Sequence, residues 1–415
     1  MIKKQVSFLR RLFRGIVAVV SLLAALGADA QGIEFGYSCG TMMSIDPYLD
    51  IIRKPMGSVH AAYVHPTSDN DSTGFARAFG FPIFSYGVAA VNFNRVRVNG
   101  SGDYCHSHAS RLGTTVALYA AFERAFLPLF NHKLQFSYAF RNGIGLSSHV
   151  WNRTSNPDNE LIGSALSIYF SAGLYSVYRT GNWRFRIGQE LGHFSNGALA
   201  RPNKGANYLN LDLSVAYLFA ENTEDRFRPS VAGRPFTDKR FLLDITYHTG
   251  LKTSIGEWLV DRRRRSEGQP LKYGHYDLYV SHNVSAAFLY RYDRRFASGV
   301  GLDMFYEPYL NDIEIQNETN KAGIPKFSFG MSVRHRVSYK RMALNMSLGV
   351  YLARRFRRYA NTDEEYGYYE RIGLSYTPPV MHDCLSVGYD IHAHRTKAYA
   401  SEITMGWQIP LGKRK

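Results

Sequence analysis

The feature that most constrains the fold of this chain is a repeated alternation of apolar and polar residues after residue 110. In one run the apolar residues occupy every second position, and polar or charged residues stand between them. The apolar set is Phe327, Phe329, Met331 and Val333, and the polar set is Lys326, Ser328, Ser332 and Arg334. Similar runs lie near residues 134–140, 241–247, 342–350, 385–391 and 403–411. Successive side chains of a β-strand point to opposite sides, so each run predicts a strand with one apolar face.

The length and the charges of these strands favour a membrane barrel over a soluble sandwich. Many runs extend for about 10 residues or more, which is the length needed to cross a bilayer obliquely. Their polar faces repeatedly carry full charges, and many runs end in Tyr, Phe or Trp, as strands do at a membrane interface. Open sheet edges are not tolerated in lipid. We therefore predict an all-β fold, a transmembrane antiparallel β-barrel of roughly 12–16 strands.

The first thirty residues predict a cleaved signal peptide. A basic front at Lys3–Arg14 precedes the short apolar segment Gly15–Leu26, and Ala28-Asp29-Ala30 matches a small-x-small cleavage site. Export combined with barrel strands predicts the bacterial outer membrane. No Pro-rich or Gly/Ser-rich linker divides the remainder, so residues 31–415 are interpreted as one barrel domain. Residues 31–110 alternate less regularly and are interpreted as shorter strands, a cap or a plug.

Charge and cysteine content limit the partners. The chain carries a net charge of +16, yet export argues against nucleic acid as the partner. Two arginine clusters, Arg262–Arg265 and Arg354–Arg358, are either solvated loops or contacts for anionic lipid phosphates. Cys39 and Cys105 either form a disulfide in an oxidising compartment or stay free. No cysteine or histidine cluster has metal-ligand spacing, so neither a metal nor an organic cofactor is predicted.

One hairpin carries residues suited to chemistry. In Trp183–Ser195 the apolar residues share odd numbers, and His193 and Ser195 lie on that same lipid-facing side. Asn207 begins the apolar face of the next predicted strand. Polar groups facing lipid are costly, which suggests a function. His193 could act as general base for Ser195 as nucleophile, with Asn207 orienting the imidazole. The alternative is that all three simply mark the polar rim of the barrel.

The same hairpin offers donors for an oxyanion. Asn203 lies in the loop that joins the two strands, and the backbone amides around Asn196, Gly197 and Ala198 lie beside the serine. Such donors stabilise the negative charge that develops on an ester carbonyl oxygen during acyl transfer. The predicted oxyanion group is therefore Asn203, Gly197 and Asn196.

The hairpin resembles a known family. The motif His193-Phe194-Ser195-Asn196-Gly197, followed by Pro202-Asn203-x-Gly205-x-Asn207, is similar to the signature of outer-membrane lipid A 3-O-deacylases and related acyloxyacyl hydrolases. The likeness is closest over Gly188–Phe219 and looser at 140–146 and 156–164. It implies a membrane barrel with its site on the outer face and lipid A, or lipopolysaccharide, as substrate. It also implies His193 as base, Ser195 as nucleophile and Asn203 as an oxyanion donor.

The chain departs from that family in two respects. Its best-known members carry a glutamate where this chain has Asn207, and an amide stabilises an imidazolium less than a carboxylate does. The chain also continues for nearly two hundred residues beyond the motif, which we interpret as extra strands widening one barrel. The predicted function is a carboxylic ester hydrolase acting on lipid A. The alternatives are a non-enzymatic porin or uptake barrel with an anion-binding lumen and a general phospholipase. The acyl position and the oligomeric state stay open.

Overall fold

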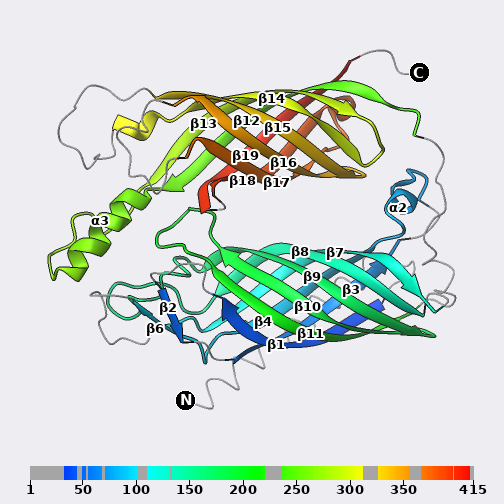
Figure 1. The fold of residues 1–415 in the computed structure, drawn as a ribbon, viewed down its shortest axis with the longest axis horizontal. Coiled ribbons are helices and arrows are strands. Elements are labelled where there is room, and N and C mark those ends of the chain that lie inside the picture. The colour runs from blue at the N-terminus through cyan, green and yellow to red at the C-terminus, as the bar shows by residue number, and fades with distance from the viewer. Residues whose placement is uncertain are drawn as a thin grey trace. The chain divides into compact units, whose positions relative to one another are not determined.

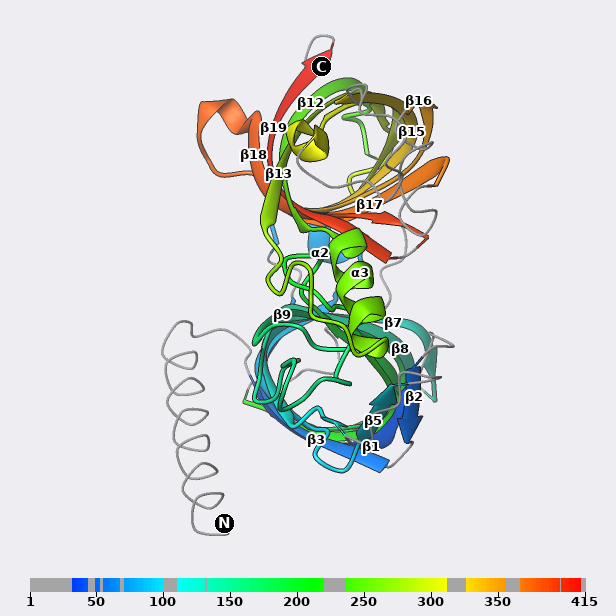
Figure 2. The same cartoon turned by 90° about the vertical axis from the view of Figure 1, so that its left-hand side faces the viewer.

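The computed structural model consists almost entirely of β-strands (Figure 1, Figure 2). It describes residues 32–43, 49–52, 55–67, 71–100, 110–130, 133–219, 236–311, 326–354, 366–395 and 397–411. The predicted signal peptide, Cys105 and residues 355–358 lie outside these ranges. Among the residues described, no helix is long and apolar enough to cross a membrane.

The first barrel is closed by eight antiparallel strands in the order β1-β11-β10-β9-β8-β7-β4-β3. Strand β1 closes the ring because it pairs with both β3 and β11. The strands are β1 (Gly32–Met43), β3 (Pro55–Pro66), β4 (Ile83–Asn92), β7 (Thr114–Leu129), β8 (Leu134–Ser147), β9 (Leu166–Thr180), β10 (Trp183–Ser195) and β11 (Ala206–Leu218). The short strands β2 (Leu49–Ile52), β5 (Arg97–Gly100) and β6 (Ser110–Arg111) form a separate sheet, and α2 spans Phe75–Ala78.

The second barrel has eight strands that follow one another in sequence, β12 to β19. It closes where β12 pairs with β19. The strands are β12 (Arg240–Thr253), β13 (Leu278–Arg291), β14 (Phe296–Tyr306), β15 (Phe327–Tyr339), β16 (Met342–Ala353), β17 (Tyr368–Tyr376), β18 (Leu385–His394) and β19 (Lys397–Leu411). One α-helix, α3 (Ile255–Ser266), and the 3-10 turns η2 (Pro308–Asn311) and η4 (Met381–Asp383) lie in its loops.

The expectation of one widened barrel over residues 31–415 was wrong. The two rings together contain sixteen barrel strands, but they close as two separate eight-stranded barrels. By contacts the chain divides into one unit of residues 1–196 and 204–233 and a second of residues 197–203 and 234–415. Once β11 pairs with β1, the first ring has no free edge left for a further strand, so the later strands must close among themselves.

The less regular segment 31–110 is mainly barrel wall, where a cap or plug was one expectation. Strands β1, β3 and β4 from this segment complete the first ring. Their alternation is weak in sequence because glycines interrupt β1 and because Ala61, Ala62, Tyr63 and Val64 are all buried in β3. Among the described residues of this segment, the sheet of β2, β5 and β6 and the short helix α2 stand apart from the wall.

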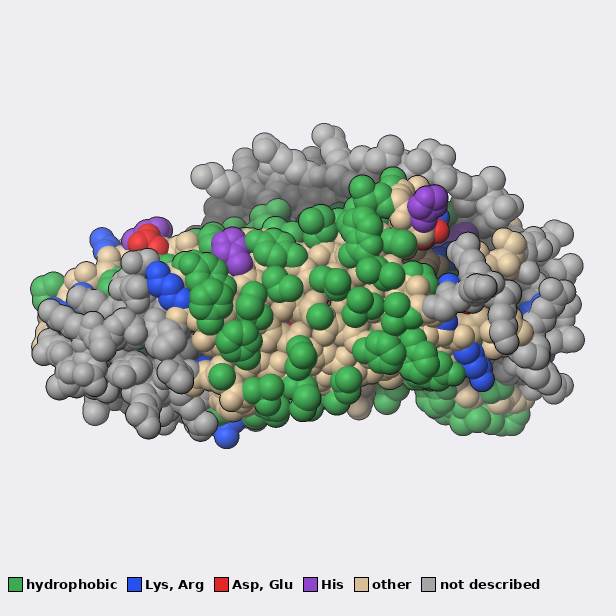
Figure 3. Space-filling model, turned by 90° about the horizontal axis from the view of Figure 1, so that it is seen from above, with side chains coloured by type: hydrophobic (Ala, Val, Ile, Leu, Met, Phe, Trp, Pro, Cys, Tyr) green, Lys and Arg blue, Asp and Glu red, His purple; other side chains and the backbone are tan. Residues whose placement is uncertain are grey.

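The predicted two-faced strands are confirmed. Apolar side chains such as Leu174, Ile187 and Leu213 are exposed on the outside of the first barrel. Figure 3 shows hydrophobic side chains over much of the outer wall of the second barrel. The interior of an eight-stranded barrel is just wide enough for side chains to fill it. In the first barrel the buried Arg186 guanidinium reaches Glu123 and Glu34, each at 3.0 Å. Charged residues therefore fill the lumen as paired groups.

The arginine run 262–265 lies within helix α3, where a polar loop was expected for residues 261–270. Ser254 caps α3 by accepting a hydrogen bond from the Glu257 amide at 3.3 Å. The carboxylate of Asp261 accepts hydrogen bonds from the backbone amides of residues 272–274, at 2.7–3.0 Å. The signal was present in the sequence, because Ser254 and Glu257 have the spacing of a capping box.

Candidate active site

Strand β10 holds His193 and Ser195 at its end on the outer wall of the first barrel. The residue between them, Phe194, points inward and is fully buried. Its ring stacks on Tyr169 with centroids 4.9 Å apart and on Tyr208 at 6.1 Å, and it meets Phe93 edge-on. This aromatic cluster anchors the strand from inside, and the alternation of side chains then fixes the two polar residues outside.

The structure brings His193 and Asn207 together. They are direct partners in the pairing of β10 with β11. The imidazole Nδ1 lies 2.7 Å from Asn207 Oδ1. An amide oxygen only accepts hydrogen bonds, so Nδ1–H donates to it and Nε2 keeps its lone pair in the neutral ring. The cross-strand contact thus leaves the histidine in the tautomer that a general base needs.

Ser195 ends the strand on the same face as His193, and both side chains are partly exposed. Residues two apart on a strand have Cα atoms about 6.6 Å from each other, so their side chains can meet on one face. Within the described part of the chain, the Ser195 hydroxyl makes no hydrogen bond with the imidazole.

Gly205 packs directly beneath the imidazole of His193. A Cβ atom added at this glycine would lie 2.5 Å from the ring Cε1 and 3.3 and 3.4 Å from Nδ1 and Nε2. Its φ of +78° also lies in the region that favours glycine. The sequence pattern included Gly205 without giving it a role. A glycine two residues before the orienting asparagine was the only signal available.

The loop between β8 and β9 holds the second half of the hairpin loop in place. The backbone amides of Lys204 and Gly205 donate to the carbonyl oxygens of Glu160 and Leu161, both at 3.0 Å. The Lys204 ammonium also lies 2.9 Å from the Glu160 carboxylate. These contacts fix the backbone that passes under the imidazole. The looser family likeness at 156–164 falls on this supporting loop.

The predicted oxyanion donors are less closely defined. Asn196 is buried, and its side-chain amide donates to the Ser164 hydroxyl at 3.1 Å, which gives the side chain a supporting contact. Gly197 has a φ of +62° and is buried. Gly197 and Asn203 both belong to the stretch 197–203, which groups with the second unit. Their placement against Ser195 stays a prediction.

Each of the two barrels matches the model of a known protein family. The family described as lipid A 3-O-deacylase (PagL) matches residues 85–216, which include β10 and all of β11 but its last two residues. The family described as acyloxyacyl hydrolase, C-terminal domain, matches residues 241–411, which are the second barrel. These segments of 132 and 171 residues together span 303 of the 415 residues. No protein of curated function matches the sequence.

Solved structures give weaker likenesses. The outer membrane enzyme PagL is 13% identical, with 44% of this chain and 97% of that chain covered and a TM-score of 0.28. The COG4313 outer membrane channel from Pseudomonas putida F1 is 11% identical, with 92% and 97% covered and a TM-score of 0.20. The siderophore receptor PirA from Pseudomonas aeruginosa is 10% identical, with 92% and 81% covered and a TM-score of 0.19. At these TM-scores the likenesses add nothing further about this chain.

Both family matches fall on closed barrels, and one contains the paired histidine and asparagine of the outer wall. The chain therefore belongs to the lipid A 3-O-deacylase and acyloxyacyl hydrolase family of outer-membrane proteins.

Proposed function

We propose that the chain is a serine esterase that hydrolyses an ester-linked acyl chain of lipid A in the outer membrane. The observation that carries the proposal is the His193–Asn207 hydrogen bond of 2.7 Å on the lipid-facing wall, with Ser195 on the same face. A polar pair at this position has no packing role in the lumen. Lipid is the substrate best able to reach it.

In the proposed reaction, Ser195 Oγ attacks the ester carbonyl carbon while His193 Nε2 takes the hydroxyl proton. Asn207 Oδ1 holds the Nδ1–H of the imidazolium. The imidazolium then protonates the departing alkoxide of the lipid as the ester bond breaks, which leaves the acyl group on Ser195. In the second step water gives a proton to His193 and attacks the acyl-enzyme. The fatty acid leaves, and His193 returns the proton to Ser195 Oγ. No metal or organic cofactor enters these steps.

The negative charge that develops on the carbonyl oxygen needs hydrogen-bond donors during both acylation and deacylation. We assign this role to Asn203 and to the backbone amides of Asn196 and Gly197, which follow the nucleophile in the chain. The turn at Gly197, with φ +62°, redirects the backbone directly after the serine.

Buried ion pairs inside both barrels argue against the alternative function of a porin. Arg184 and Glu34, which form an ion pair at 3.1 Å, are 2% and 3% exposed inside the first barrel. In the second barrel Arg371 and Glu402 are similarly buried and paired at 2.8 Å. A channel needs an open aqueous path, which larger barrels provide.

The test is to compare lipid A from cells that produce the wild-type chain with lipid A from cells that produce Ser195→Ala. Mass spectra should show loss of one acyl chain with the wild type and intact lipid A with the variant. Ser176→Ala is the matched control, because Ser176 lies partway along β9, pairs with Ile187 of β10, and is only partly exposed. It should behave as the wild type.

The same lipid extracts distinguish a lipid A esterase from a barrel without enzymatic activity and from a general phospholipase. Identical lipid A in wild-type and Ser195→Ala cells, with both proteins folded in the membrane, would refute the esterase. Loss of phospholipid acyl chains with intact lipid A would instead assign the site to a general phospholipase.

Asn207→Leu should lower kcat about tenfold, because it removes one hydrogen bond worth roughly 1–1.5 kcal/mol while keeping side-chain size. Asn207→Asp should match or exceed the wild-type rate, since a carboxylate stabilises the imidazolium better than an amide. Initial rates on purified lipid A in detergent measure both. Equal rates for wild type and Asn207→Leu would show that the contact does not orient the base.

A further inference from the structure

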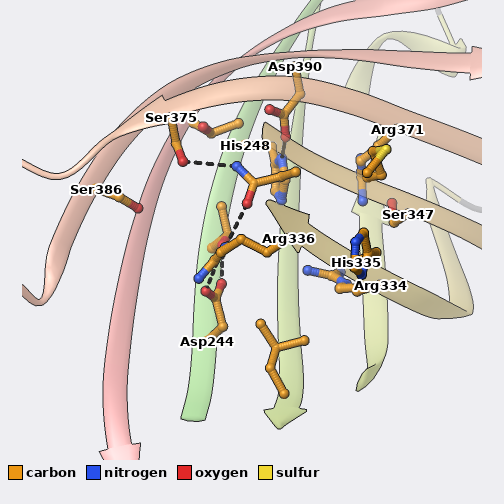
Figure 4. A pocket seen from close by; sticks show the side chains of 15 residues that line it. Asp244, His248, Arg334, His335, Arg336, Ser347, Arg371, Ser375, Ser386 and Asp390 are labelled. Carbon is orange, nitrogen blue, oxygen red and sulfur yellow. Dashed lines mark hydrogen bonds and ion pairs between the residues drawn. The ribbon is translucent and has the colours of Figure 1, made fainter. Parts of the chain in front are cut away.

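The second barrel contains a buried group of side chains suited to a metal ion. His248 of β12, Asp390 of β18 and Glu402 of β19 place one ligand atom each within 4.8 Å of one another. They are 2%, 8% and 0% exposed. Among the described residues, this is the only group of three such side chains that meets this distance. Figure 4 shows the Asp390 carboxylate pointing toward His248, with a dashed line marking the ion pair between them.

Only one ring nitrogen of His248, Nε2, makes a hydrogen bond of normal geometry within the described residues. Ser285 donates its only hydroxyl proton to Asp303 Oδ1 at 2.6 Å. Its oxygen can therefore only accept from His248 Nε2, which lies 3.1 Å away. The Nδ1 atom of His248 has no hydrogen-bond partner in the described structure, and neither has Asp390 Oδ1.

Two carboxylate oxygens converge on the other ring nitrogen, Nδ1. Glu402 Oε2 lies 3.2 Å and Asp390 Oδ2 lies 3.7 Å from His248 Nδ1. Ligands bound tetrahedrally at about 2.1 Å from Zn²⁺ are about 3.4 Å apart, which is the same range. A hydrogen bond on the far ring nitrogen is also the usual way in which a metal-binding histidine is oriented.

The first barrel provides an internal comparison. Its buried His60 also faces two carboxylates, but each ring nitrogen faces a different one. Nε2 lies 3.4 Å from Glu34 and Nδ1 lies 3.6 Å from Asp212. In that arrangement each ring nitrogen has one carboxylate of its own. In the second barrel both acids face one nitrogen, while the other nitrogen is bonded to a hydroxyl.

The surrounding charge and space also suit a cation. Four carboxylates, which are Asp244, Asp303, Asp390 and Glu402, face only three guanidinium groups, which are Arg334, Arg336 and Arg371. His392 Nδ1 also lies 3.6 Å from Glu402, so with His248 and His392 both neutral this cluster has one more negative than positive charge. The adjoining cavity of about 50 Å³ has room for a few water molecules, since each needs about 10–15 Å³. Water can therefore complete the coordination.

We propose that His248 Nδ1, Asp390 and Glu402 bind a divalent transition metal ion, with Zn²⁺ the best match to one imidazole and two carboxylates. The three ligands come from three adjacent strands, β18, β19 and β12. The pairing of β19 with β12 is the one that closes the barrel. The ion would therefore fasten the seam between the first and last strands, a role separate from ester hydrolysis.

Metal analysis of the untagged full-length chain, refolded without metal and dialysed against micromolar Zn²⁺, tests the proposal. The wild type should retain about one Zn²⁺ per chain and should unfold at a higher temperature with Zn²⁺ than without it. Asp390→Asn should lower the occupancy about tenfold or more, and Ser285→Ala should weaken binding by about 10- to 100-fold by freeing the imidazole.

His335→Gln is the matched control, because His335 lines the same cavity but bonds to Ser298. It should bind Zn²⁺ as the wild type does. Heat-modifiable migration on gels shows whether each variant has folded. A folded wild type that retains no Zn²⁺, or equal retention by Asp390→Asn, would overturn the proposal and leave His248 as an imidazolium paired with the acids. Ca²⁺ at the same concentration should not displace Zn²⁺.

Discussion

Replacing His193 by glutamine is expected to lower the rate of lipid A deacylation by at least about 10³-fold, the scale on which such sites lose activity without their base. Glutamine keeps a polar side chain at the rim but cannot take the Ser195 proton. The barrel itself should remain folded, because His193 lies on the outer wall and its described hydrogen bond is to Asn207 alone. The measurement is kcat on purified lipid A in detergent.

The double variant His193→Gln/Ser195→Ala gives the sharper test of a shared mechanism. Residues that act as one catalytic unit are not additive, so the double variant should be no slower than either single variant. The matched control is His282→Gln, which changes a partly exposed histidine of the second barrel that bonds to Tyr247. It should retain the wild-type rate. Multiplied losses in the double variant would show that the two residues contribute separately.

The β-strands could be predicted from local sequence patterns, but the way in which they close into two barrels could not. Alternation identified the strands and the lumen-facing residues, because the side chains of a strand follow a strict period of two. Whether the strands form one ring or two depends on pairing between distant segments. Gly32 pairs with Leu218 in one ring, and Phe241 pairs with Leu411 in the other. Nothing in the alternation of a single strand specifies such a partner.

For the candidate site too, the face on which each residue lies could be predicted from the sequence, whereas the contacts between distant segments could not. His193 and Ser195 share odd numbers with the apolar residues of their strand, which predicted both on the outer wall. Asn207 was predicted on the same wall because it begins the apolar face of the next strand. The pairing of β10 with β11 then set the 2.7 Å contact between His193 and Asn207. Gly205 could not be assigned from sequence, because its role depends on a loop backbone held by carbonyl groups of Glu160 and Leu161. The unpartnered nitrogen of His248 depends on strands that are distant in sequence in the same way.

Gly205→Ala is expected to lower kcat by about 10²-fold, since a displacement of about 1 Å in a catalytic group can cost that much. The added methyl group would lie 2.5 Å from His193 Cε1, so the imidazole must move or turn. It would then lose its alignment with Asn207 and with Ser195. Substrate binding should change little, because the glycine contacts the ring from below. KM should therefore stay close to the wild-type value.

A second glycine of the same barrel provides a control for the effect of backbone strain on the activity of Gly205→Ala. Gly181, in the turn before β10, also has a positive φ, +52°, but a Cβ there would meet nothing within 4 Å. Gly181→Ala therefore carries a similar strain of about 1–2 kcal/mol without touching the site. If both variants lose stability but only Gly205→Ala loses activity, the methyl group acts through the imidazole. Equal activity losses would mean that strain in the barrel, and not the position of His193, limits the reaction.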